Sequence, residues 1–324
     1  MCGIAGIWSL NGNRPNITEM RKMLAVQGHR GPEGAAFTKM DKQNLLLGFL
    51  QLGFTDGNSG MQPLFNEDGT IALVYNGEIY GYKKIRDELI KKGHQFYTES
   101  DSEVLIHLYE SYGIEFIHQL NGEFAFALYD ANKKQLLMAR DPFGVNPLCY
   151  AFHNGNFFFS SEAKGILATN GFPRKFSHDY LKSVGIGIPN TEVTLFDQIK
   201  NLRPGHFMLL NRNEYKIKQY WKPTFNKCKD DYKTAKEKVQ SLLTQSVNRR
   251  LNGNPPLAIS LSSGLDSTVI AGIIKNTGNK NPAFSMGYAH RTFDEAAVAK
   301  KTCQHFGINH HTVNVSLNEL AENF

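Results

Sequence analysis

Short apolar runs separated by turn residues fill the first two thirds of the chain. The runs alternate only in part between apolar and polar positions, which is typical of strands in sheets covered on one face or on both. Asn-Gly and Asp-Gly pairs supply the turn signals between them. The runs that predict strands span residues 45–52, 70–80, 122–130, 134–141, 156–162 and 205–211.

Two segments among these strands repeat apolar residues at helical spacing instead. Residues 82–93 end on a glycine, and residues 100–113 begin with Ser-Asp-Ser-Glu, a helix-capping signal. Helices interspersed with such strands predict a layered α/β domain in which sheets pack against helices. We expect this domain to span residues 1–210.

The pattern changes after residue 210. Polar and aromatic residues predict a connection up to residue 231, and residues 232–251 predict a long amphipathic helix. Strand, helix, strand, helix and strand follow in residues 255–315, an order typical of a parallel sheet. We therefore expect a second α/β domain over residues 211–324. The apolar side of its first helix is predicted to carry Ala235, Val239, Leu242, Leu243 and Val247.

The predicted second domain is only partial. A Ser-x-x-Glu capping box at residues 316–319 predicts another helix, which reaches Phe324 five residues later. Doubly wound domains usually contain five or more parallel strands, and three strands leave a sheet edge without a partner. We expect a truncated domain, or one that another chain completes.

Composition is that of an ordinary globular chain, with 41% hydrophobic and 20% charged residues and a formal net charge of +6. The sequence contains no run of five like charges, so nothing in it indicates nucleic-acid binding. It also contains no stretch of 18 apolar residues that would predict a membrane span. The first 25 residues lack a signal-peptide pattern. The four cysteines are far apart and form no Cys-x-x-Cys pair, which suggests neither a zinc site nor a disulfide framework. We therefore expect the protein to be located in the reducing cytoplasm.

A cysteine directly follows the initiator methionine. Removal of Met1 would give Cys2 a free α-amine, whose unperturbed pKa of about 7.7–8 suits a general base for its own thiol. This is the logic of an N-terminal nucleophile. The alternative is an ordinary cysteine near a disordered terminus.

Two further stretches carry candidate chemistry, each with a plainer alternative. Asn76-Gly77 follows an apolar run, and such a turn can present a backbone N–H and a side-chain amide as an oxyanion hole, or be a simple hairpin turn. Asp101 lies at a predicted helix start, where it can cap the helix or hold a substrate ammonium group. The charged loop at residues 29–34 can equally be structural.

A glycine-containing loop joins the first strand and helix of the second domain. Backbone N–H groups at that helix N-terminus can bind phosphate, and the acidic residue suggests a nearby Mg²⁺. The loop lacks the Gly-Lys-Ser/Thr of a Walker A motif. The alternative is a plain strand–helix turn. The loop residues are Ser262, Ser263, Gly264, Asp266 and Ser267.

Taken together in this order, these segments resemble the class II glutamine amidotransferases, and among them the glutamine-hydrolysing asparagine synthetases. The resemblance covers essentially the whole chain and implies an αββα sandwich of the N-terminal-nucleophile type, followed by a partial ATP-pyrophosphatase domain. It rests on residues 1–7, 29–34, 76–81, 100–105, 120–130, 139–150, 160–167, 203–206 and 258–272.

The resemblance also implies roles for individual residues. Cys2 would attack the side-chain amide of glutamine, Asn76 and Gly77 would form the oxyanion hole, and Glu78 and Asp101 would bind the α-amino end. Ammonia would pass to an ATP-activated aspartate. In the second domain, Leu261 and Met286 would flank the nucleotide, and Asp266 would ligate Mg²⁺.

The chain departs from the family pattern in three respects. The family has an arginine where this chain has Gln51, and that arginine grips the α-carboxylate of glutamine; a neutral amide offers a weaker hydrogen bond. The first glycine of the pyrophosphatase loop is Ser263, and the family's later synthetase motifs do not occur in these 324 residues.

Three interpretations follow. The first is an asparagine synthetase-like enzyme that uses glutamine, aspartate and ATP, alone, as a homodimer or with a complementing synthetase chain. The second is an amidotransferase acting on a different carboxylate. The third is a degenerate or regulatory paralogue that binds a partner synthetase.

Overall fold

The computed structural model describes residues 1–53, 60–185, 191–251, 257–288 and 295–322. The chain divides into two compact units, Met1–Phe225 and Asn226–Phe324. Each unit is described by itself. No helix in the described ranges has the length and apolar character needed to cross a membrane.

The first unit contains two six-stranded sheets, and every pair of neighbouring strands is antiparallel. In the first sheet the order is β10 (Lys200–Asn201), β8 (Cys149–His153), β9 (Asn156–Ser160), β1 (Gly3–Ser9), β3 (Leu45–Gln51) and β2 (Gly34–Met40). In the second it is β12 (Tyr215–Gln219), β11 (His206–Leu210), β7 (Gln135–Arg140), β6 (Gly122–Asp130), β5 (Ile71–Ile79) and β4 (Leu64–Phe65).

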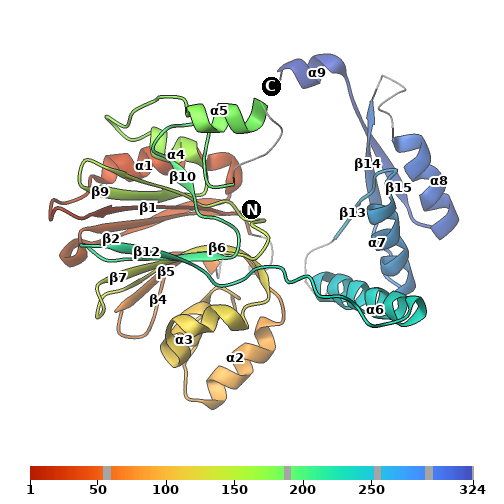
Figure 1. The fold of residues 1–324 in the computed structure, drawn as a ribbon, viewed down its shortest axis with the longest axis horizontal. Helices are drawn as coiled ribbons and strands as arrows, with labels where there is room; N and C mark the ends of the chain where they lie inside the picture. The colour runs from red at the N-terminus through yellow and green to blue at the C-terminus, as the bar shows by residue number, and fades with distance from the viewer. Residues whose placement is uncertain (54–59, 186–190, 252–256, 289–294, 323–324) are drawn as a thin grey trace. The chain divides into compact units, whose positions relative to one another are not determined.

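Helices cover the outer face of each sheet, as Figure 1 shows. A core cluster formed by both sheets fills the space between them. Two further clusters lie under the helices on the two outer faces. The first sheet carries α1 (Ile17–Ala25), α4 (Ala163–Leu167) and α5 (His178–Gly185), and the second carries α2 (Tyr82–Lys91) and α3 (Glu103–Tyr112).

Strand β5 shows how the sequence builds these layers. Ala72 and Val74 point into the core between the sheets, whereas Leu73 and Tyr75 point to the helices. Both sets are buried, so the strand reads as a nearly continuous apolar run rather than a clean alternation. The αββα architecture implied by the resemblance is confirmed.

The first unit extends beyond residue 210, where the sequence predicted its end. Residues Tyr215–Gln219, expected to be a connection, form β12 and pair with β11 along the edge of the second sheet. All five residues of β12 are exposed. The strand therefore has no buried face that its sequence pattern could have revealed. The unit ends at Phe225.

The second unit contains the predicted parallel sheet, in the order β13 (Ile259–Ser260), β14 (Ala283–Tyr288) and β15 (His310–Val315). The capping box at Ser316 forms as expected, because its Oγ accepts from the Glu319 N–H at 3.2 Å and Glu319 accepts from the Ser316 N–H at 2.8 Å. The helices are α6 (Tyr232–Leu251), α7 (Leu265–Asn276), α8 (Ala296–Phe306) and α9 (Leu317–Glu322).

The apolar side predicted for α6 is wrong in most positions. Val239, Leu242 and Leu243 are exposed by 56%, 65% and 41%, and only Val247 joins the core of the unit. Val247 packs in the cluster that includes Ile274 of α7. The hydrophobic periodicity of α6 is weak, and within the described part of the unit the helix packs apolar residues into the core only near its C-terminal end.

Candidate active site

A cavity of about 250 Å³ opens in the first unit beside the start of β1. The structure brings all six residues predicted for catalysis and glutamine binding into its lining: Cys2, Gln51, Asn76, Gly77, Glu78 and Asp101. They come from the residue just before β1, from β3, from β5 and from the segment that leads into α3. Residues distant in sequence therefore converge on one small site.

Cys2 immediately precedes β1, which lies between β9 and β3 and is fully buried. Its Sγ lies 3.6 Å from the carbonyl oxygen of Leu52 and 3.4 Å from the Leu52 N–H nitrogen. The Arg30 Nε–H donates to the Cys2 carbonyl oxygen at 3.0 Å, and Arg30 Nη1 pairs with Glu162 at 2.9 Å. The loop at residues 29–34 therefore positions the cysteine.

The thiol and the N-terminal amine have shifted pKa values. Burial raises the pKa of the Cys2 thiol, and the Leu52 N–H opposes this only in part. Burial also lowers the pKa of the Met1 amine below 8.0. Near neutral pH the thiol is therefore protonated, while the amine is shifted toward its neutral, proton-accepting form. A base beside the thiol is thus a chemical requirement of this site.

Asn76 and Gly77 lie inside strand β5 and do not form the predicted turn. Residues of β5 two apart direct their backbone N–H groups to the same edge of the strand. The Tyr75 N–H donates to Gln62 at 2.6 Å, and the Ile79 N–H donates to Asp101 at 2.7 Å. The Gly77 N–H lies between these two, on the edge that borders the cavity.

The local dipeptide preference is overridden because β6 approaches Gly77 very closely. A Cβ atom at Gly77 would lie 2.3 Å from the carbonyl oxygen of Glu123 and 2.8 Å from Phe124 Cα. The side chain of Asn76 is buried, and its Nδ2 donates to Asn146 Oδ1 at 2.9 Å. Both predicted oxyanion donors are therefore fixed by their neighbours before any substrate binds.

Asp101 holds the edge of β5 rather than the helix that follows it. Its Oδ2 accepts from the Tyr75 hydroxyl and from the Ile79 N–H, both at 2.7 Å. The N-cap residue of α3 is Ser102, and it makes no side-chain cap bond. The carboxylate is 5% exposed and lines the cavity.

Sequence analysis missed several residues that build the site. Glu123 lines the cavity and lies directly opposite Glu78 across the β5–β6 ladder. Asn146, Arg30 and Glu162 position the predicted residues. A signal was available for Glu123, because Asn-Gly-Glu occurs at residues 76–78 and again at residues 121–123.

The cavity is acidic, with the carboxylates of Glu78, Asp101 and Glu123 in its lining. Among its described lining residues none is a lysine or an arginine. Gln51 is buried at the end of β3, where it faces Gly34 of β2. The acidic groups suit an ammonium group, and Gln51 adds a neutral amide to the lining.

In the second unit, the loop predicted to bind phosphate joins β13 to the N-terminus of α7. Ser262 Oγ and Ser267 Oγ lie 2.8 Å apart, and the Gly264 N–H donates to Ser262 at 3.1 Å. The Ser263 N–H donates to the Glu295 carboxylate at 3.1 Å, so an anionic oxygen already lies at this donor.

Open space at the loop fits a phosphate, because a Cβ atom at Gly264 would meet only Ser262 Oγ within 4 Å. Asp266 lies in the first turn of α7 and is exposed. A single carboxylate suits Mg²⁺, which is held mainly by phosphate and water oxygens.

The two residues predicted to flank the nucleotide lie on different faces of the sheet. Leu261 is buried in the core of the unit, and its backbone N–H donates to Phe284 at 2.9 Å. Met286 of β14 is 51% exposed on the opposite face. The side chains of Leu261 and Met286 therefore cannot both contact one nucleotide. Leu261 could contact a nucleotide beside Met286 only through its backbone.

The four layers and the cysteine at the head of a central strand define a glutamine amidotransferase of the N-terminal-nucleophile type. The family described as "Glutamine amidotransferase domain" matches residues 1–221, which is more than half of the chain. The chain therefore belongs to this family. A solved structure titled as the allosteric regulatory enzyme of purine biosynthesis has the same fold. It aligns with a TM-score of 0.51 and 16% identity over 100% of this chain and 70% of its own.

The second unit matches a different family, described as "Asparagine synthase", over residues 238–324. Asparagine synthetase [glutamine-hydrolyzing] 1 of Bacillus subtilis is 31% identical over 318 residues, which cover 95% of this chain and 49% of that protein. Amidase chry2 of Gibberella zeae is 30% identical over 355 residues, which cover 100% of this chain and 52% of that protein. The predicted similarity to asparagine synthetases is confirmed, and the chain spans about half the length of these relatives.

Proposed function

We propose that the first unit hydrolyses glutamine with Cys2 as the nucleophile. The observation that carries this proposal is the shared cavity of Cys2, Asn76, Gly77 and Asp101. Its volume of about 250 Å³ suits one amino acid rather than a polymer.

In the proposed reaction, the Cys2 thiol attacks the side-chain amide carbon, and the Cys2 α-amine accepts the thiol proton after Met1 has been removed. The Gly77 N–H and the Asn76 amide stabilise the oxyanion. The proton passes to the leaving ammonia, and water then hydrolyses the thioester to glutamate. Glu78 and Asp101 hold the α-ammonium group, and Gln51 contacts the carboxylate.

We propose that the second unit belongs to a synthetase half that transfers this ammonia to aspartate. The loop residues Ser262, Ser263, Gly264 and Ser267 would hold ATP phosphates, and Asp266 would hold Mg²⁺. The match to the asparagine synthase family supports this assignment. When bound, ATP would activate the acceptor carboxylate.

The exposed apolar side chains of α6 support completion of this unit by further synthetase polypeptide. That polypeptide can belong to the same chain, to a second copy or to a complementing chain. We place this activity in the cytoplasm, in keeping with four free cysteines.

Glutamate release from glutamine tests the glutaminase proposal. The chain with Met1 removed should release glutamate, Cys2→Ala should not, and the exposed Cys228→Ala should match the parent chain. Equal glutamate release by the parent and Cys2→Ala would refute Cys2 as the nucleophile.

A different acceptor is the second candidate function, because a relative named an amidase is 30% identical over the full chain. Incubation with ATP, glutamine and a series of carboxylates, together with a synthetase half, distinguishes the two. Asparagine as the sole product supports the first candidate. A regulatory paralogue remains the third, and it predicts no glutamate release at all.

A further inference from the structure

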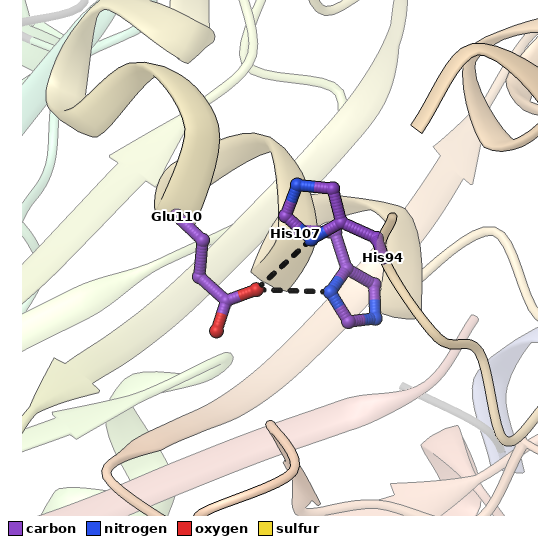
Figure 2. A group of neighbouring side chains, drawn as sticks. All are labelled: His94, His107 and Glu110. Carbon is purple, nitrogen blue, oxygen red and sulfur yellow. Dashed lines mark hydrogen bonds and ion pairs between the residues drawn. The ribbon is translucent and has the colours of Figure 1, made fainter. Parts of the chain in front are cut away.

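A cluster of two histidines and a glutamate lies in the first unit, away from the catalytic cavity. His94 lies in the connection between α2 and α3, whereas His107 and Glu110 lie one turn apart on α3. Figure 2 shows both imidazole rings turned toward the same carboxylate oxygen. None of the three residues lines the cavity that contains Cys2.

The three ligand atoms have the spacing of a metal site that has not closed on an ion. Glu110 Oε2 lies 2.9 Å from His107 Nδ1 and 3.4 Å from His94 Nδ1, and the three atoms lie within 4.8 Å of one another. Ligands at about 2.1 Å from a tetrahedral ion are about 3.4 Å apart. Small side-chain rotations would therefore bring all three atoms to an ion.

An outer partner orients two of the three side chains, His94 and Glu110. His94 Nε2 lies 2.7 Å from Ser111 Oγ, which directs its Nδ1 toward Glu110. The second oxygen of Glu110, Oε1, accepts from Asn66 Nδ2 at 2.9 Å. Such partners fix the tautomer and direction of metal ligands.

His107 carries a separate sign of an unfinished site. Its side chain is 1% exposed, and its Nε2 has no hydrogen-bond partner within the described residues. The nearest carboxylate oxygen, Glu103 Oε1, lies 3.7 Å from that nitrogen. A metal ion bound to Nδ1 of His107 would leave the ring proton on Nε2. The Nε2–H could then donate to Glu103, which gives the carboxylate–histidine–metal arrangement common at metal sites.

From these contacts we propose that His94, His107 and Glu110 bind one Zn²⁺ ion, with water in the fourth position. Two imidazoles and a carboxylate are ligands that Zn²⁺ accepts in proteins. The ion would tie the connection at residue 94 to α3. That connection leads directly to Asp101, so the ion would act as a structural support for the edge of the catalytic cavity.

Zinc binding to the full 324-residue chain tests the proposal directly. The parent for this experiment carries Cys2→Ala and Cys228→Ser, which removes the two cysteines that are not buried. Metal-free chain is dialysed against ZnCl₂, and bound zinc is measured by elemental analysis. The expected result is one Zn²⁺ per chain, with a higher Tm in the presence of Zn²⁺.

Two variants remove ligands, and a third is a matched control. His94→Ala and Glu110→Gln each remove one of three protein ligands, so each should weaken zinc binding by more than the roughly 10–100-fold cost of losing an outer-shell partner, and should abolish the rise in Tm. Glu110→Gln keeps the side-chain volume and the acceptor for Asn66, so it remains decisive if His94→Ala folds poorly. His118→Ala disrupts an exposed His–Glu pair, 3.7 Å apart, and should bind as the parent does.

The alternative is a purely ionic cluster, in which His107 is an imidazolium between Glu103 and Glu110. It predicts no stoichiometric zinc in the parent. That result would overturn the proposal, as would zinc binding that Glu110→Gln leaves unchanged in a folded chain. Neither result bears on glutamate release, so the glutaminase proposal is tested separately.

Discussion

Replacing Asp101 by asparagine tests the double use of one buried carboxylate. Its Oδ2 accepts two hydrogen bonds of 2.7 Å, from the Tyr75 hydroxyl and the Ile79 N–H. The asparagine oxygen can accept both bonds with nearly the same shape. The substitution therefore removes charge while keeping volume, and it separates the support of β5 from the binding of a substrate ammonium group.

The structure sets the size of the expected loss. Hydrogen bonds to charged groups contribute about 1.5–3 kcal/mol, and neutral ones about 1 kcal/mol. The change costs about 1 kcal/mol for each of two buried bonds, or about 2 kcal/mol in the free energy of unfolding. For a unit of this size, that loss lowers Tm by about 4–8 °C.

Thermal unfolding and glutamine kinetics together give the assay. Asp101→Asn should lower Tm by this amount and raise the KM for glutamine about tenfold, since a charged partner of the α-ammonium group is lost. Tyr75→Phe is the control for stability, because it removes one of the two bonds and leaves the carboxylate in place. In the Asp101→Asn background, Tyr75→Phe should cost about 1 kcal/mol less than in the parent.

Two outcomes would refute the argument at different points. An unchanged Tm for Asp101→Asn would show that the two short bonds do not stabilise the unit. A lower Tm with an unchanged KM would show that Asp101 only positions β5, and would leave the ammonium group to Glu78 and Glu123.

Three further predictions concern the same cavity. Gly77→Ala should lower the free energy of unfolding by about 1–3 kcal/mol in denaturant titrations, because its Cβ would meet rigid backbone of β6, whereas Gly28→Ala has open space and should cost little. Gln51→Arg should lower the KM for glutamine roughly fivefold in steady-state assays, by supplying a cationic partner for the carboxylate; an unchanged KM would place that carboxylate elsewhere. Glutaminase activity should fall as pH drops through the pKa of the Cys2 α-amine, about 7.7–8 when unperturbed, since only the neutral amine accepts the thiol proton. A peptide tag left before Cys2 should abolish activity at every pH, because it blocks that amine.

Long apolar runs made much of the fold predictable. The apolar runs that became β3, β5, β6, β7, β9 and β11 are long, and the two helices α2 and α3 follow their predicted ranges. Strand β1 carries glycines at Gly3 and Gly6, which weaken a strand signal. A Cβ atom at Gly6 would lie 2.0 Å from the ring of Phe159, so the glycine is set by packing against β9 and not by local preference.

The site was predictable in its members but not in its geometry. Asn-Gly favours a turn locally, and Asp at a helix start favours a cap. In the structure, the close approach of β6 keeps Gly77 in a strand, and two buried donors draw Asp101 away from α3. Both errors come from tertiary contacts between segments that are 20 or more residues apart in sequence.

The position of Cys2 explains how a chain terminus can be held firmly enough for the proposed chemistry. Termini fray unless secondary structure holds them, and β1 is held on both sides, by β9 and by β3. Cys2 directly precedes this strand, so the buried sheet restricts its position. Arg30 further fixes the Cys2 carbonyl oxygen through a hydrogen bond. Because Glu162 balances the charge of Arg30, the guanidinium stabilises this position without occupying the cavity. In the proposed reaction the sheet holds the thiol in place, and the adjoining α-amine acts as the base once Met1 has been removed.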